Sequence, residues 1–271
     1  MSEQTDPDAP LLLLDSGVGG LTVLAELRKL LPQAPVIYVA DYAALPYGEK
    51  TERQIAARVP ALLGRLAERY HPRLVTIACN TASTIALAAV REALDLPVVG
   101  TVPAIKPAAS LTQTGTIGLL GTAATIRQAY VDNLEAEFAG NKTLLRFAAP
   151  GLVAAAEEKL RGRKPDPAVF KAAAEGLRAQ PGGADIDVIV LACTHFPLLE
   201  EELGAAFAAT GRPVRFIDGA GGIARRMQFL TSGQHFQRTV PDLAVITGES
   251  QSIEELRPAL APFGLERIER L

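Results

Sequence analysis

Short apolar runs alternate with longer amphipathic stretches along most of the chain, and this alternation constrains the fold more than any other feature. Most of the short runs are continuously apolar, which is typical of strands covered on both faces of a parallel sheet. The predicted strands are Leu11–Asp15, Pro35–Asp41, Leu74–Cys79, Pro97–Thr101, Thr116–Gly121, Thr143–Phe147, Asp187–Cys193, Val214–Asp218 and Leu243–Thr247.

Helical periodicity fills the intervals between these runs. Leucine, isoleucine and valine recur at helical spacing from Leu21 to Leu31 and from Ile55 to Leu66. Further helices are predicted over Thr81–Leu94, Ala123–Phe138, Asp166–Leu177, Leu198–Ala208, Gly222–Leu230 and Ile253–Leu260. Strands and helices in this repeated order predict an α/β fold with right-handed crossovers.

Two breaks in the pattern predict two similar α/β domains with mainly parallel sheets. Proline-rich sequence follows residue 101, and a turn-forming segment ends at Pro213. We expect a first domain over 1–103 plus 213–271 and a second domain over 104–212. The segment Val75–Thr81 resembles Ile189–His195, which supports two related halves.

Composition excludes several classes of function. The net charge of −3 gives no positive field that would attract nucleic acid or an anionic membrane. No run reaches the ~18–20 apolar residues of a membrane helix, and Leu11–Leu14 is too short for a signal-peptide core. We therefore expect a cytoplasmic protein that binds neither nucleic acid nor membrane. The oligomeric state stays open, with a homodimer among the alternatives.

The chain has only two cysteines, Cys79 and Cys193, and each follows an apolar run and precedes small polar residues. At a strand end before a helix, nearby backbone N–H groups and the helix dipole favour the thiolate form. A single cysteine in such a place is equally well explained as a small buried hydrophobe. Two cysteines in matching contexts favour a functional pair.

Three short motifs accompany the cysteines. His195 follows Cys193 by two residues, where it would assist the thiol, hold a substrate carboxylate or serve only as a structural histidine. Asp15 ends the first strand, where it would pair with a substrate ammonium group or assist Cys79. The loop Pro46-Tyr47-Gly48 offers backbone N–H groups that suit a carboxylate, although alone it indicates only a turn.

Other types of site fit less well. Gly17-Val18-Gly19 begins a dinucleotide-binding pattern with Asp41 at a suitable distance, but Thr22 occupies the third glycine position. The cysteines and the histidines show no paired metal-ligand spacing, so no metal is expected. A pyridoxal-binding lysine is not excluded by motif.

Taken together and in order, these segments resemble the glutamate racemases of the aspartate/glutamate racemase superfamily. The matching segments are Asp15–Val23, Pro46–Gly48, Ala78–Ser83, Val102–Pro107 and Ala192–Leu199. The resemblance implies interconversion of L- and D-glutamate for peptidoglycan without a cofactor, at an active site in the cleft between two α/β domains.

The resemblance also assigns residues. It implies that Cys79 and Cys193 are the two acid/base thiols and that Asp15 and His195 assist them. The substrate-binding positions that it implies are Asp15, Ser16, Tyr47, Gly48, Asn80, Thr81, Thr194 and His195. Glu157 corresponds to a further acidic residue through a loose match of the segment Pro150–Glu157.

Some positions depart from the family pattern. Ala43-Ala44-Leu45 replaces a loop that often carries an arginine, Ala192 replaces a glycine, and Phe196 replaces a tyrosine. Neither thiol is affected. Two rival functions remain open, which are racemisation of another acid such as aspartate and amino-acid binding without catalysis.

Overall fold

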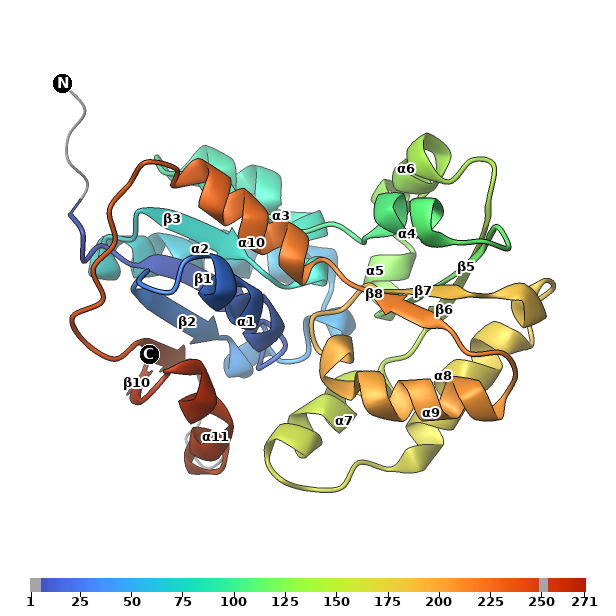
Figure 1. Cartoon of the computed structure of the whole chain (residues 1–271). Coiled ribbons are helices and arrows are strands. Elements are labelled where there is room, and N and C mark those ends of the chain that lie inside the picture. The colour runs from blue at the N-terminus through green and yellow to red at the C-terminus, as the bar shows by residue number, and fades with distance from the viewer. Residues whose placement is uncertain (1–5, 249–252) are drawn as a thin grey trace. The chain divides into compact units, whose positions relative to one another are not determined.

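The computed structural model describes residues 6–248 and 253–271, and within them the chain forms two compact units (Figure 1). Unit 1 contains the residues up to Thr101 together with Ala220–Leu271, and unit 2 contains Val102–Gly219. Each unit has its own parallel sheet with helices packed against it, so the predicted α/β class with two domains of similar construction is confirmed.

The sheet of unit 1 has six strands in the order β10-β9-β2-β1-β3-β4, all parallel to their neighbours. Central strand β1 is completely buried, as its continuous run of leucines predicts. The strands are β1 (Leu11–Asp15), β2 (Val36–Ala40), β3 (Leu74–Ile77), β4 (Val98–Val99), β9 (Leu243–Ile246) and β10 (Arg267–Arg270).

Helices α1 and α10 pack together, as do α2 and α3, and their apolar stripes cover the sheet of unit 1 (Figure 1). Helix α2 begins with a capping box in which the Thr51 hydroxyl accepts from Gln54 N and the Gln54 side chain accepts from Thr51 N. The helices are α1 (Leu21–Leu30), α2 (Glu52–Tyr70), α3 (Asn80–Ala93), α10 (Ala220–Leu230) and α11 (Ile253–Leu260), with 3-10 turns η1 (Tyr42–Ala44), η2 (Tyr47–Glu49) and η6 (Ala261–Phe263).

Unit 2 has a four-stranded parallel sheet in the order β6-β5-β7-β8. Its strands are β5 (Thr116–Gly121), β6 (Thr143–Ala148), β7 (Val188–Leu191) and β8 (Arg215–Ile217). Its helices are α4 (Ile105–Leu111), α5 (Ala123–Ile126), α6 (Ala129–Phe138), α7 (Gly151–Leu160), α8 (Pro167–Arg178) and α9 (Glu200–Ala209), with turns η3 (Gly183–Asp185) and η4 (Phe196–Leu199).

Several elements differ from the sequence prediction for identifiable reasons. The break expected at Ile105–Pro107 is the start of α4, because a proline in the first turn of a helix loses no internal hydrogen bond. The single helix predicted over Ala123–Phe138 is two helices, because Gln128 between them has an extended backbone. Strand β10 is charged and half-exposed, so it carries no apolar run to find.

The second unit extends further than the expected limit at residue 212. The segment after Pro213 forms β8, which pairs with β7 in the sheet of unit 2, and the chain passes to unit 1 at Ala220. Within residues 6–248 and 253–271, no helix combines the length and the hydrophobicity needed to cross a lipid bilayer.

Candidate functional site

Asp15 lies at the carboxyl end of β1, in a rigid turn that leads into α1. Its side chain is completely buried, and its Oδ1 accepts a hydrogen bond from Gly17 N at 3.0 Å. The Tyr38 hydroxyl holds the same turn by donating to Gly17 O at 2.7 Å. A Cβ at Gly20 would lie 3.0 Å from both Asp15 Cβ and Tyr38 Oη, so a larger residue there would press on both side chains.

Cys79 lies beside Asp15 in the topology of unit 1, because β1 and β3 are adjacent and Leu14 pairs with Ile77. The thiol is buried and is not part of a disulfide. Cys79 is the N-cap residue of α3, and its carbonyl accepts from Ser83 N at 2.9 Å. Asn80 and Thr81 open the first turn of α3. The predicted position of this thiol, between a strand end and a helix, is confirmed.

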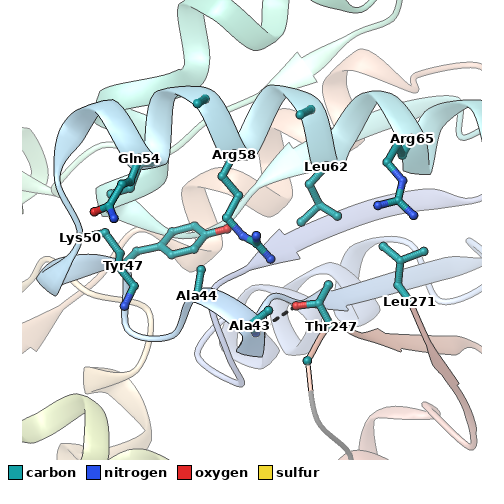
Figure 2. A pocket seen from close by; sticks show the side chains of 14 residues that line it. Ala43, Ala44, Tyr47, Lys50, Gln54, Arg58, Leu62, Arg65, Thr247 and Leu271 are labelled. Atoms are coloured by element: carbon teal, nitrogen blue, oxygen red, sulfur yellow. Dashed lines mark hydrogen bonds between the residues drawn. The ribbon is translucent and has the colours of Figure 1, made fainter.

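The loop that carries Tyr47 and Gly48 is fixed by Asp41, a completely buried carboxylate at the end of β2. Tyr47 Oη donates to Asp41 Oδ2 at 2.5 Å, and Arg58 donates to both carboxylate oxygens at 2.6 Å. Thr247 Oγ1 donates to Asp41 Oδ1 and accepts from Ala43 N at 3.1 Å. Figure 2 shows Tyr47, Arg58 and Thr247 converging from the loop, α2 and the end of β9.

Electrostatics reinforces this arrangement. Burial alone would raise the pKa of Asp41, but hydrogen bonds from Arg58, Thr247 and Tyr47 outweigh it and hold the pKa below its ordinary value. Burial, the charge of Asp41 and the proximity of Cys79 raise the pKa of Tyr47. Tyr47 is therefore a neutral hydrogen-bond donor, committed to Asp41.

Because the Tyr47 hydroxyl already donates to Asp41, the groups of this loop that can bind a ligand are its backbone N–H groups. Within the part of the chain that the structure describes, the N–H groups of Tyr47 and Gly48 donate to no acceptor. Both belong to the first turn of η2, where N–H groups have no partner inside the helix. The backbone donors predicted for a carboxylate are thus present.

In unit 2, Cys193 follows β7 and precedes η4, and its thiol is buried and free. Cys193 Sγ lies 3.9 Å from His195 Nδ1, and His195 Nε2 lies 3.0 Å from Glu157 Oε1. Arg161, one helical turn after Glu157 on α7, donates to Glu157 Oε2 at 2.7 Å. Thr194, between the cysteine and the histidine, is buried as well.

This chain of contacts determines the hydrogen positions on His195. A carboxylate can only accept, so with Glu157 ionised beside Arg161 the Nε2 atom of neutral His195 carries the hydrogen. Nδ1 then presents its lone pair to Cys193.

The predicted residues thus fall into two groups, one in each unit. Unit 1 holds Asp15, Ser16, Tyr47, Gly48, Cys79, Asn80 and Thr81, and unit 2 holds Glu157, Cys193, Thr194 and His195. Among residues 6–248 and 253–271, no cluster of three or more His, Cys, Asp or Glu side chains fits a metal ion.

Sequence reasoning missed the residues that support these groups, namely Asp41, Arg58, Thr247 and Arg161. The sequence places Asp41 only in a dinucleotide-binding pattern that fits poorly, whereas its carboxylate is enclosed by donors of its own unit. A signal was available for Arg161, because Glu157 and Arg161 have the i, i+4 spacing of a helical ion pair. The other contacts join residues far apart in sequence.

Comparison with known proteins decides the family. The model of the Asp/Glu/Hydantoin racemase family matches residues 22–227. This chain belongs to the Asp/Glu/Hydantoin racemase family. The predicted resemblance and the predicted class of enzyme, an amino-acid racemase, are confirmed.

Relatives in this family match nearly the whole chain. The glutamate racemase of Sphingopyxis alaskensis is 61% identical over 264 residues, which is 97% of each protein. The structure of Escherichia coli glutamate racemase with L-glutamate and the activator UDP-MurNAc-ala has a TM-score of 0.89 at 40% identity, covering 97% of this chain and 98% of that one. The isoform RacE1 of Bacillus anthracis has a TM-score of 0.81 at 27% identity, covering 98% of both chains.

Proposed function

We propose that this racemase interconverts L- and D-glutamate without a cofactor, using Cys79 and Cys193 on opposite faces of the substrate Cα. The observation that carries the proposal is a pair of buried thiols outside any disulfide, each following a parallel strand, with His195 in contact with Cys193 and Asp15 at the end of the strand next to Cys79. The 61% identity to a glutamate racemase supports glutamate as the substrate.

The reaction moves one proton to the substrate and one away from it. One thiolate removes the Cα proton, and the opposite thiol donates its proton to the other face, which leaves the two sulfurs in exchanged protonation states. The roles reverse for the other enantiomer. Each positioned acid or base contributes roughly 10²–10⁴ in rate. The mechanism requires both thiols to reach a single substrate molecule.

The auxiliary residues prepare the thiols. In unit 2, His195 accepts the proton of Cys193 through Nδ1 while Glu157 holds its Nε2–H, so the imidazolium that forms is stabilised by the carboxylate. In unit 1, Asp15 lies at the end of the strand next to Cys79 and assists it or holds the substrate ammonium group.

Charge that develops on the α-carboxylate must also be stabilised, because an amino-acid Cα–H is weakly acidic. The start of α3 at Asn80 and Thr81 provides N–H groups and a positive dipole for it. The free N–H groups of Tyr47 and Gly48 bind the second carboxylate. Ser16 and Thr194 complete the set of polar contacts. The D-glutamate produced would serve cytoplasmic peptidoglycan synthesis.

Isotope exchange tests the assignment of the thiols. In deuterated water, the native enzyme should racemise glutamate with uptake of deuterium at Cα. Cys79→Ala and Cys193→Ala should each abolish racemisation. Each variant should still exchange the Cα proton of one glutamate enantiomer slowly, and the two variants should act on opposite enantiomers. Full racemisation by either variant would eliminate the mechanism. Circular dichroism checks that both variants are folded.

A cross-linking experiment tests whether both thiols reach one substrate. Because the chain has only two cysteines, dibromobimane should join Cys79 to Cys193 within one chain, as read by mass spectrometry. Glutamate should suppress the cross-link. Turnover of D-glutamate and D-aspartate, followed by optical rotation, shows which of the two is the substrate. Binding of glutamate without exchange of its Cα proton would indicate a non-catalytic protein.

A further inference from the structure

A cavity of about 610 Å³ in unit 1 has no role in the proposed reaction (Figure 2). It runs along α2 and is closed on the other side by the loop that carries Ala43 and Tyr47 and by Thr247 and Leu271. Gln54 and Arg65, at opposite ends of the α2 wall, are eleven residues apart, which is about 16 Å at 1.5 Å per residue.

The charged side chains that line this cavity are positive. Lys50, Arg58 and Arg65 contribute to its wall, and no aspartate or glutamate side chain does so among the described residues. Arg58 is already neutralised by Asp41. Within residues 6–248 and 253–271, neither the Lys50 ammonium group nor the Arg65 guanidinium group has a carboxylate partner. Two cations therefore remain for a ligand.

Between these cations the wall combines apolar side chains with Arg58, whose charge Asp41 neutralises. Figure 2 places Lys50 at one end of the view and Arg65, above Leu271, at the other, with Ala44, Leu62 and the guanidinium group of Arg58 between them. We propose that the cavity binds a small organic molecule that has an anionic group at each end and a short apolar body. Charge-assisted hydrogen bonds to Lys50 and Arg65 hold the two ends, and Leu62 contacts the body.

The position of the cavity connects it to the candidate substrate site. Its wall includes Tyr47, whose backbone N–H is one of the free donors of the loop. A ligand that contacts Tyr47 and Lys50 stabilises the loop in the arrangement held by Asp41, and thereby favours substrate binding. This coupling rests on the proposed function, whereas the ligand site itself does not.

Binding of defined probes to the full chain tests the site. Hexane-1,6-diyl bisphosphate should bind in calorimetric titration at least tenfold more tightly than hexyl phosphate, and inorganic phosphate should bind more weakly than either. Arg65→Ala should weaken binding of the bisphosphate about tenfold, the loss of one charge-assisted contact. Equal binding of the three probes would overturn the proposal.

Arg53→Ala is the matched control. Arg53 is an exposed cation on α2 that does not line the cavity, so its removal changes the net charge equally. It should leave binding of the bisphosphate unchanged, and an effect as large as that of Arg65→Ala would show non-specific attraction and overturn the site.

Racemisation assays test the coupling separately. The bisphosphate should lower KM for glutamate with little change in kcat, and Arg65→Ala should remove this effect while leaving basal activity intact. Binding without any change in KM overturns the coupling alone. Binding to a protein that does not racemise glutamate supports the site and overturns the proposed function.

Discussion

His195 has a contact on each of its two ring nitrogens, and in the proposed function this single residue prepares the thiol of unit 2. Nδ1 faces a thiol and Nε2 faces a carboxylate, while the imidazole is almost completely buried. Glu157 in turn accepts from Arg161 through its other oxygen. The contacts place four side chains, those of Cys193, His195, Glu157 and Arg161, in one sequence.

A glutamine at position 157 should reverse the hydrogen position on His195. Arg161 would hold the amide oxygen of Glu157→Gln, leaving the NH₂ group to donate to His195 Nε2 and forcing the hydrogen onto Nδ1. We expect kcat to fall roughly 10²-fold with KM little changed, because acid/base assistance is lost. Steady-state racemisation measures the effect.

Glu158→Gln provides the control for that variant. Glu158 is the next residue along α7, is half-exposed and pairs with Arg163, so its neutralisation makes the same charge change away from His195. Its kcat should match the native value. Equal losses in the two variants would show that charge alone is responsible.

Asp41→Asn should lower the free energy of unfolding at neutral pH. It should also make this free energy depend less on pH in the acid range. The pKa of Asp41 is depressed in the folded state, so its contribution to stability is present above the unfolded value near 3.8 and is lost as pH falls through the folded value. We expect a loss of about 1–3 kcal/mol at pH 7, as for a buried hydrogen-bond partner.

Thermal or urea unfolding at pH 7 and below pH 4 checks the sign. The difference between the native chain and Asp41→Asn should shrink as the pH falls. Exposed Asp95→Asn should show no such dependence. A constant difference across the range would mean that ionisation of Asp41 does not contribute.

Among the secondary-structure elements, the buried strands were predicted most reliably, from their continuous apolar runs. All four central and buried strands β1, β2, β3 and β9 were predictable because burial on both faces requires a continuous apolar run. Helix α7 was recognised only as a segment around Glu157 because its apolar face is mostly alanine. Contacts such as Arg58 with Asp41 depend on how elements pack, which local patterns do not encode.

Replacing each of two helical glycines in unit 2 with alanine should change the stability of the protein in opposite directions. A Cβ at Gly176 in α8 would lie 2.2 Å from the Phe147 ring, whereas a Cβ at Gly204 in α9 would have its nearest neighbour at 3.8 Å. We expect Gly176→Ala to destabilise the protein by about 1–3 kcal/mol. Gly204→Ala should stabilise it by up to about 1 kcal/mol.

Urea unfolding of both variants decides the point. Combining Gly176→Ala with Phe147→Leu should recover part of the loss, since the smaller side chain leaves room for the methyl group. A stabilised Gly176→Ala variant would show that Phe147 moves aside at no cost, contrary to the expected clash.

At the scale of the whole molecule, the two units differ in how the chain builds them. Unit 2 is one continuous segment with its own sheet and its own hydrophobic cluster. Unit 1 is completed only when β9 pairs with β2. The two matching cysteine segments were visible in the sequence, but the limit at Gly219 was not, because the sequence does not show that the strand after Pro213 pairs with β7.

The segment 102–219, expressed alone, should therefore fold. We expect a cooperative thermal transition by circular dichroism and dispersed amide resonances, because every strand of its sheet lies within the segment. It should not racemise glutamate, since Cys79 is absent. The segment 1–101 alone should fail to give a cooperative transition, and a stable fold for it would contradict this account.

The pairing of β2 with β9 joins Ile37 to Leu243 and so spans most of the polypeptide. Translation adds about 5–20 residues per second. The edge of β2 therefore stays unpaired for at least about ten seconds while the residues between β2 and β9 are synthesised. An open strand edge is a template for pairing with other chains. The segment that carries β9 is thus the one that covers this edge and protects the nascent protein from aggregation.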